Sequence, residues 1–152
     1  MKTSYPLRSL VLSFLLFLAL YATAFPETPP PTTGRLTVSV HGLKTTNGKV
    51  IVNVFRKEDD LFGKPYLQRE AVITQTTATL EFPDLPFASY TVFAFHDENN
   101  NGTVDHNLFR MPKEPMGYSN HWHFGLFTGM PTFEKTKVEF SQGKPEVTIT
   151  LK

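Results

Sequence analysis

The strongest constraint on this chain is the alternation of apolar and polar residues at every second position. Leu36, Val38 and Val40 alternate with threonine and serine, and the same period of two recurs in short runs along the chain. This pattern is typical of half-buried β-strands, in which successive side chains point to opposite faces. After residue 24, no segment has a sustained period of 3.6 residues. The sequence therefore predicts an all-β domain.

Seven such runs predict the architecture, and they lie around residues 36–40, 50–54, 71–73, 78–82, 90–95, 138–140 and 147–151. Seven short strands in about 118 residues favour a single antiparallel two-sheet β-sandwich, prealbumin-like or immunoglobulin-like, over a closed barrel. Ile51 and Phe55 lie on the second face of their strand, so we expect this strand to be covered on both faces. Asn47-Gly48 precedes it and is a strong hairpin signal.

Residues 1–24 have the three parts of a secretory signal peptide. Lys2 and Arg8 form the positive end, residues 10–20 are apolar apart from one serine, and Ala22-Thr23-Ala24 matches a small-residue cleavage site. The apolar run is about a dozen residues long, which suits a signal peptide, whereas a membrane span needs about 20. We therefore expect an exported protein, periplasmic or extracellular, with no membrane span after cleavage.

The segment that follows predicts a linker and then one domain. Residues 25–34 contain four prolines and nothing aliphatic to bury, which is typical of a semi-extended tether, so the domain is expected at 35–152. The chain has 15 Lys and Arg against 14 Asp and Glu, and cleavage would remove two cations, leaving a net charge of −1. This balance argues against a nucleic-acid partner. The absence of cysteine excludes a disulfide scaffold and a thiolate metal site.

An acidic loop is the clearest chemical signal. Residues 97–105 read D-E-N-N-N-G-T-V-D, with a glycine at the sixth position that permits a sharp turn. The candidate oxygen ligands stand at positions 1, 3, 5, 7 and 9 of the loop and are Asp97, Asn99, Asn101, the carbonyl of Thr103, and Asp105. Hard oxygen ligands favour calcium over metals that prefer softer ligands. The sequence therefore predicts a Ca²⁺ site.

One ligand of the helical calcium loop is missing from this pattern. Position 12 is Leu108 instead of a bidentate glutamate, so an acid would have to come from elsewhere. The candidates are Glu114, Asp84, Asp59 and Asp60. With only two carboxylates among the five loop ligands we expect weak binding, with a Kd of roughly 0.1–1 mM. The alternative is an asparagine-rich turn held by hydrogen bonds from its side chains to its own backbone.

Three blocks in order resemble a known bacterial family. Residues 90–105 end in H-D-E-N-N-N-G-T-V-D, residues 111–120 read M-P-K-E-P-M-G-Y-S-N, and residues 127–134 read F-T-G-M-P-T-F-E. From about residue 36 to 151, the chain resembles the bacterial domain-of-unknown-function family numbered 2141. That family has no established activity, so the resemblance implies only an exported single domain and its fold.

Two positions depart from the family pattern. Asn100 replaces the usual glycine at loop position 4, and residues 87–89 replace a proline–glycine turn. The first change makes the loop stiffer but leaves the ligand positions intact.

Two alternative sites use other residues. His121 and His123 would lie on one side of an extended segment and, with His96, predict a periplasmic copper or zinc site. The alternative is ordinary hydrogen bonding by loop histidines.

The aromatic residues Tyr118, Trp122 and Phe124 could bind a carbohydrate or a peptide, or they could roof the open end of the sandwich. No nucleophile–base motif, metalloprotease motif or phosphate loop is present, so we predict no catalytic residues. The sequence thus predicts an exported, non-catalytic β-sandwich with a calcium loop and an unidentified protein or carbohydrate partner.

Overall fold

The computed structural model describes residues 30–109, 111–123, 125 and 128–152. The predicted signal peptide, the first half of the predicted linker and Phe124 lie outside the described residues. The chain divides into two units, Met1–Pro31 and Thr32–Lys152. The fold below is that of the second unit, whose first strand begins at Thr33, within the segment predicted as linker.

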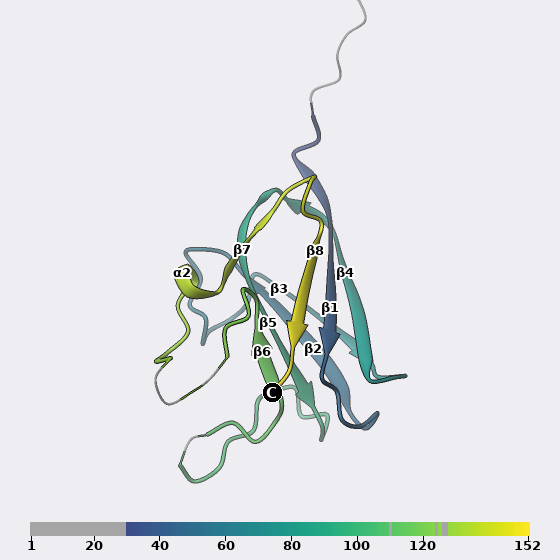
Figure 1. Cartoon of the computed structure of the whole chain (residues 1–152), viewed down its shortest axis with the longest axis vertical. Helices are drawn as coiled ribbons and strands as arrows, with labels where there is room; N and C mark the ends of the chain where they lie inside the picture. The colour runs from purple at the N-terminus through teal and green to yellow at the C-terminus, as the bar shows by residue number, and fades with distance from the viewer. Residues whose placement is uncertain (1–29, 110, 124, 126–127) are drawn as a thin grey trace, which may run out of the picture. The chain divides into compact units, whose positions relative to one another are not determined.

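The described residues form two β-sheets and one short helix (Figure 1). The three-stranded sheet has the order β4 (Thr77–Pro86), β1 (Thr33–His41) and β8 (Glu146–Thr150). The five-stranded sheet begins with β3 (Leu67–Val72), β2 (Lys49–Phe55) and β5 (Ala88–Asp97). On the other edge of β5, β6 (Met116–Tyr118) and β7 (Lys137–Phe140) pair one after the other, and α2 (Phe133–Thr136) leads into β7. The predicted all-β, two-sheet architecture is confirmed.

Three details of the predicted sandwich are corrected. The described residues contain eight strands instead of seven, because β6 has three residues and is too short to show alternation. The strands are not all antiparallel, since β1 and β8 pair in parallel, with Val38 opposite Val147. The immunoglobulin order places the first two strands in one sheet, whereas here β1 and β2 lie in opposite sheets.

Among the residues described, no helix is long and apolar enough to span a membrane.

The hairpin predicted at Asn47-Gly48 is also wrong, because β1 and β2 do not pair with each other. Gly48 is required here for another reason. Its φ is +75°, and a Cβ at this position would overlap the backbone carbonyl of Asp97. The turn therefore packs directly against the end of β5, where the acidic loop begins.

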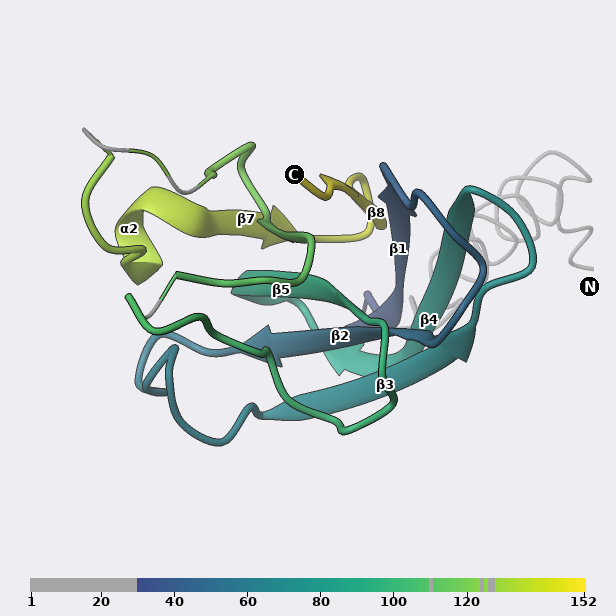
Figure 2. The ribbon, with the colours of Figure 1, turned by 90° about the horizontal axis from the view of Figure 1, so that it is seen from below.

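The two sheets enclose the main core. Figure 2 shows that β1 and β4 run in a different direction from β2, β3 and β5. The aliphatic side chains between the sheets come from five strands and include Leu36, Val38, Val40, Val50, Val52, Val54, Leu80, Val92, Ala94, Val147 and Ile149. Because the chain has no cysteine, burial of this cluster is its main source of stability.

The outer face of the five-stranded sheet is buried as well. Ile51 and Phe55 of β2, Phe93 and Phe95 of β5, and Tyr118 of β6 form a second apolar cluster. Leu61, Val104, Met116 and Trp122, from loops and a strand end, pack against it. The prediction that the β2 strand is covered on both faces is confirmed, and the loops that cover it bring the acidic loop beside an aromatic surface.

Candidate functional site

The acidic loop folds back onto the carboxylate at the end of β5. Asp97 is fully buried, and its Oδ1 and Oδ2 accept hydrogen bonds from the backbone N–H groups of Asn101 at 3.0 Å and Gly102 at 2.8 Å. Asn100 and Gly102 have φ values of 61° and 80°. Asparagine and glycine adopt this left-handed conformation more readily than other residues. The departure from the family pattern at Asn100 is therefore compatible with the turn.

The next side chains continue this arrangement through the loop. Asn99 Oδ1 accepts the N–H of Asn101 at 3.0 Å, and Asn101 Oδ1 accepts the N–H of Thr103 at 2.8 Å. The amide nitrogens of Asn99 and Asn101 donate to the two oxygens of Asp105, at 2.8 and 3.0 Å. Thr103 Oγ1 also donates to Asn101 Oδ1, at 3.1 Å. The structure thus brings together all five residues that the sequence assigned to the calcium site.

Glu114 bridges the two ends of the loop. Its side chain lies in the segment before β6 and is only 5% exposed. Oε1 accepts the backbone N–H of Glu98 at 3.0 Å, and Oε2 accepts that of Asp105 at 3.1 Å. A bidentate contact of this kind holds the first and last parts of the loop in register. Of the acids that the sequence could not rank, Glu114 is the one in contact with the loop.

The other candidate acids are engaged elsewhere. The guanidinium of Arg56 bonds to Asp59 at 3.0 Å, and this hydrogen bond holds the pKa of the Asp59 carboxyl below its usual range. Asp60 Oδ1 accepts the N–H of Phe62 at 3.0 Å. Asp84 is exposed near the end of β4, with a φ of 56°.

One lysine lies close to the buried carboxylate of the loop. Lys49 Nζ is 2.7 Å from Glu70 Oε2 and 3.9 Å from Asp97 Oδ2. The hydrogen bond to Glu70 is the main reason that the pKa of Lys49 is raised, and the charge of Asp97 adds to it. Two backbone N–H groups and this ammonium group therefore compensate the buried charge of Asp97.

The three histidines of the predicted copper or zinc site occupy different environments. His96 is fully buried, and its Nε2 donates to the carbonyl oxygen of Asn47 at 2.6 Å. In the part of the chain that the structure describes, its Nδ1 has no hydrogen-bond partner and lies 3.8 Å from Glu98 Oε1. His121 has a φ of 55° in a turn, so the segment is not extended as the prediction required. His121 lines a hollow beside β7 and β8, whereas His123 lines a different one.

In the described part of the chain, no group of three or more His, Cys, Asp or Glu side chains is placed to hold a metal ion. The histidines are therefore not brought together as predicted. The same finding applies to the carboxylates of the acidic loop, where amide and carbonyl oxygens supply three of the five predicted calcium ligands.

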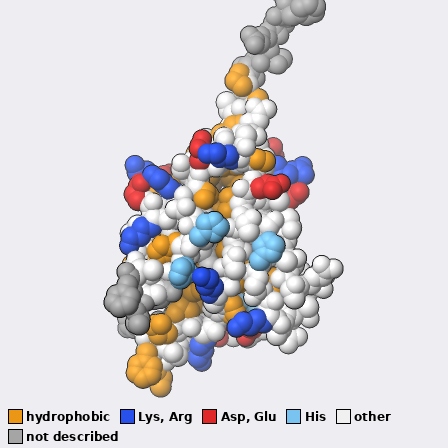
Figure 3. Space-filling model, viewed as in Figure 1, with side chains coloured by type: hydrophobic (Ala, Val, Ile, Leu, Met, Phe, Trp, Pro, Cys, Tyr) orange, Lys and Arg blue, Asp and Glu red, His pale blue; other side chains and the backbone are white. Residues whose placement is uncertain are grey.

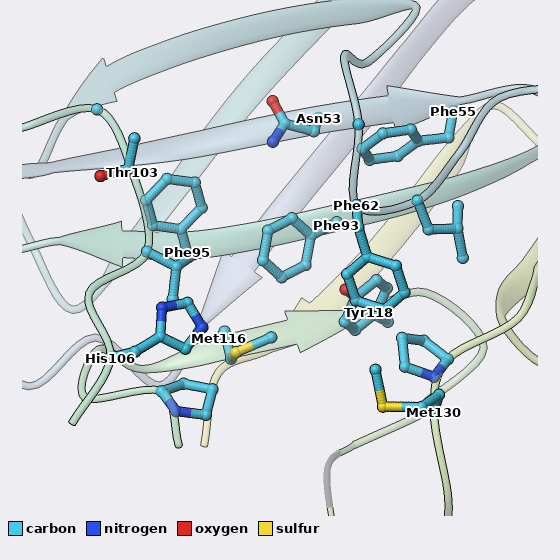
Figure 4. Close-up of a pocket in the computed structure, with 16 residues that line it drawn as sticks. Asn53, Phe55, Phe62, Phe93, Phe95, Thr103, His106, Met116, Tyr118 and Met130 are labelled. Carbon is cyan, nitrogen blue, oxygen red and sulfur yellow. The ribbon is translucent and has the colours of Figure 1, made fainter. Parts of the chain in front are cut away.

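A cavity of about 720 Å³ lies on the outer face of the five-stranded sheet, next to the loop (Figure 4). Phe55, Phe93, Phe95 and Tyr118 contribute aromatic rings to its wall. The ring centroids of Phe93 and Tyr118 are 4.5 Å apart, and those of Phe93 and Phe95 are 5.6 Å apart. Residues 102–104 of the acidic loop form another part of the wall. The loop and the cavity thus share a boundary.

One polar group of this cavity is not among the residues that the sequence pattern singled out. Asn53 lies within β2, is 8% exposed, and its Oδ1 has no hydrogen-bond partner among the described residues. The signal was available as a single amide inside the apolar run V-I-V-N-V-F. A buried polar atom without a partner is costly and often marks a functional position.

The predicted ligand-binding aromatics have different positions. Tyr118 belongs to the outer cluster, and burial raises the pKa of its phenol to about 12. The ring of Trp122 meets that of Tyr118 edge to face, with centroids 5.2 Å apart. Tyr118 and Trp122 are therefore in contact, and both help to cover the outer face of the five-stranded sheet.

Comparison with known proteins identifies one family. The family model described as "Uncharacterized protein conserved in bacteria (DUF2141)" matches residues 38–148, and this match confirms the resemblance drawn from the three sequence blocks. No curated protein and no solved structure matches the chain.

Proposed function

We propose that this chain, which belongs to the uncharacterized bacterial family DUF2141, is an exported, non-catalytic β-sandwich whose 97–105 loop binds one calcium ion. The ion would order the loop and the surface around it, either for stability or for interaction with a protein or carbohydrate partner. Export rests on the three-part pattern of residues 1–24.

The contact of Glu114 with both ends of the loop is the observation that carries this proposal. The loop pattern has ligands at positions 1, 3, 5, 7 and 9 but lacks the acid at position 12. Glu114 supplies a buried carboxylate at the point where the loop closes, through the backbone of Glu98 and Asp105. Each Glu114 oxygen accepts one backbone N–H and keeps a further lone pair that could face a cation.

The hydrogen bonds inside the loop are compatible with an ion. Asn99 Oδ1 and Asn101 Oδ1 accept backbone N–H groups, and a carbonyl oxygen has a second lone pair that can bind a cation. The amide NH₂ groups of Asn99 and Asn101 donate hydrogen bonds to the two oxygens of Asp105. Calcium binding by Asp105 would break these two hydrogen bonds. Binding would then compete with existing hydrogen bonds, in agreement with the weak affinity expected.

Calorimetric titration with CaCl₂ tests the proposal. We expect one binding event with a Kd of roughly 0.1–1 mM in the unaltered protein. Asp105→Asn should abolish it, because the substitution removes one of the two carboxylates among the loop ligands while keeping the side-chain shape. Asp97→Ala should abolish it as well, although it also removes the acceptor of two backbone N–H groups.

Asp60→Asn is the matched control, because it removes the same charge from an exposed aspartate and keeps the oxygen that accepts the N–H of Phe62. The calcium event should be unchanged in this variant. Equal binding heat in Asp105→Asn, or no binding heat together with a melting temperature that chelator leaves unchanged, would contradict the proposal.

The alternative functions have less support. A copper or zinc site would need His121 and His123 to converge, yet they line different hollows and His96 is fully enclosed. A carbohydrate site would need open ring faces, and Tyr118 is packed against Phe93 and Trp122.

A further inference from the structure

We propose that the loop between β5 and β6 docks this protein on an anionic lipid bilayer. Leu108, Phe109 and Met111, which we call the apolar tip, would enter the bilayer, and nearby lysines would lie against the lipid phosphate groups. The inference does not depend on the calcium proposal, because it rests on other side chains.

The apolar tip is exposed to an unusual degree. Leu108 is 99% exposed, Phe109 is 86% exposed and Met111 is 48% exposed. Figure 1 shows that the loop between β5 and β6 extends beyond the ends of the strands. Large apolar side chains are unfavourable in water, and several of them close together on a protruding loop usually mark an interaction surface.

Hydrogen bonds within the loop support this arrangement. Asn107 Oδ1 accepts the backbone N–H groups of Phe109 at 2.9 Å and Met111 at 3.0 Å. The N–H of Asn107 donates to the carbonyl oxygen of Met111 at 2.9 Å, and that of Lys113 donates to the carbonyl oxygen of Asp105 at 2.9 Å. The loop thus presents its apolar side chains outward before any partner is present, so insertion would cost little further ordering.

A hollow of about 600 Å³ beside the apolar tip supplies positive charge. Met111 of the tip lines this basic hollow together with three lysines, Lys44, Lys113 and Lys152. All three lysines are exposed, and they come from segments that are far apart in the chain. Figure 3 shows apolar side chains at the lower end of the domain and Lys or Arg side chains on the same face.

The lysines of the basic hollow differ from several others on the surface. Lys49, Lys137 and Lys144 each pair with a glutamate, so their charge is compensated within the protein. In the described part of the chain, no ion pair includes a lysine of the basic hollow. Unpaired cations beside an apolar surface match the phosphate groups and acyl chains of an anionic bilayer.

The acids of this region compensate the lysines only in part. Glu114 also lines the basic hollow, but it is 5% exposed and both of its oxygens accept backbone N–H groups. Asp97 is fully buried, whereas Glu98 and Asp105 are partly or half exposed. The three exposed lysines therefore form a local positive cluster, although the net charge expected for the exported domain is −1.

The shape of the surface favours a bilayer over a protein partner. Leu108 and Phe109 project into solvent, so a protein would need a matching pocket to bury them. A bilayer yields around a projecting side chain and accepts apolar groups among its acyl chains, while lysine side chains extend to the headgroups.

A fluorophore attached to the apolar tip tests the inference. The chain has no cysteine, so Phe109→Cys gives a single position for an environment-sensitive nitrobenzoxadiazole label. We expect saturable enhancement and a blue shift of its emission with vesicles of phosphatidylcholine and phosphatidylglycerol in equal parts, in the presence of EDTA. Vesicles of phosphatidylcholine alone should bind at least about tenfold more weakly.

The label has a matched control in Phe62→Cys. Phe62 is also an exposed phenylalanine, at 63%, but it lies in the loop between β2 and β3. The emission of a label at this position should stay unchanged when the same vesicles are added. The comparison reports insertion of the apolar tip itself and not attachment of the chain through another segment.

Further substitutions in the Phe109→Cys protein separate the two contributions. Leu108→Ser should weaken the apparent affinity at least about tenfold, because it removes an inserted apolar side chain. Lys113→Gln should weaken it about fivefold, because it removes one cation near the phosphate groups. Lys64→Gln is the matched control and should leave the affinity unchanged, since Lys64 is an exposed loop lysine that does not line the basic hollow.

The inference is overturned if the labels at positions 62 and 109 respond equally, or if vesicles without phosphatidylglycerol bind as tightly. Equal losses in Lys64→Gln and Lys113→Gln also overturn it. If neither kind of vesicle changes the emission at position 109, the tip does not enter a bilayer, and a protein with a matching pocket becomes its partner. Because EDTA is present throughout, a failure of the calcium proposal leaves these outcomes unaffected.

Discussion

The two faces of β2 and β5 are both buried, but they differ in chemistry and in packing. The inner face carries small and β-branched side chains such as Val52, Val92 and Ala94, which pack against the three-stranded sheet. The outer face carries Phe93 and Phe95, which are covered by loops and border a cavity. Two sheets can fit each other along their whole faces, whereas loops cover a sheet unevenly.

The two faces therefore differ in what they can contribute to the protein. The inner face is closed and aliphatic, so it mainly provides free energy of folding. The outer face combines rigid strands with variable loops, an unpaired amide oxygen and the acidic loop at its boundary. A binding site is more readily accommodated on the second kind of face, because its loops can change without disturbing the core.

Removing one phenylalanine from each face should have the largest effect and should distinguish the two. Phe82 belongs to the inner core and Phe95 to the outer cluster, and both are almost fully buried. Phe82→Ala should lower the free energy of unfolding by about 3–5 kcal/mol. Phe95→Ala should cost about 1–2 kcal/mol less, because water from the cavity can enter the vacated space. Urea unfolding measures both losses, and equal losses would mean that the outer face is as closed as the inner one.

The second-largest effect is expected from alkaline pH, which should lower the free energy of unfolding through Tyr118 on the outer face. Burial raises the pKa of Tyr118 to about 12, whereas a tyrosine of the unfolded chain has a pKa of about 10. The stabilising contribution of the neutral Tyr118 phenol is therefore fully present below pH 10. It is lost as the pH rises from 10 toward 12, because the phenol of the unfolded chain loses its proton at a lower pH than that of the folded chain. The loss should reach about 2–3 kcal/mol.

Tyr90 on the inner face provides the comparison. Its pKa is also raised by burial, and its hydroxyl donates to the carbonyl of Pro86 at 2.9 Å. Unfolding measured between pH 9 and 12 should show that Tyr118→Phe removes more of the alkaline loss than Tyr90→Phe. The opposite order would contradict the assignment of the larger shift to Tyr118.

The smallest expected effect is a gain in stability. Asn53→Leu replaces a buried amide with an apolar side chain of similar size, so it should raise the free energy of unfolding by about 1 kcal/mol. Gln68 is the neighbour of Asn53 on β3 and is exposed, so Gln68→Leu should stay within about 0.5 kcal/mol of the unaltered protein. Thermal unfolding of both variants checks this, and a loss of stability in Asn53→Leu would show that the amide has an internal partner.

The sequence predicted the elements better than their pairing. Alternation of apolar residues located seven of the eight described strands and both buried faces of β2, because period and burial are local properties of a strand. Alternation did not locate β6, which has only three residues. The Asn47-Gly48 dipeptide wrongly predicted a hairpin between β1 and β2. Gly48 is needed because the backbone of Asp97 passes close to it, and a contact between distant segments leaves no local pattern.

The residues of the candidate sites also fall into two groups, those that local sequence spacing identifies and those that only tertiary contacts identify. The sequence by itself selected five candidate ligands within the 97–105 loop, because oxygens at alternate positions of a tight turn can face one centre. Only the tertiary structure selected Glu114 as the acid that closes the loop and placed Asn53 among the rings of a cavity. Both depend on segments that meet through strand pairing and loop packing, and these contacts join residues that are far apart in the chain.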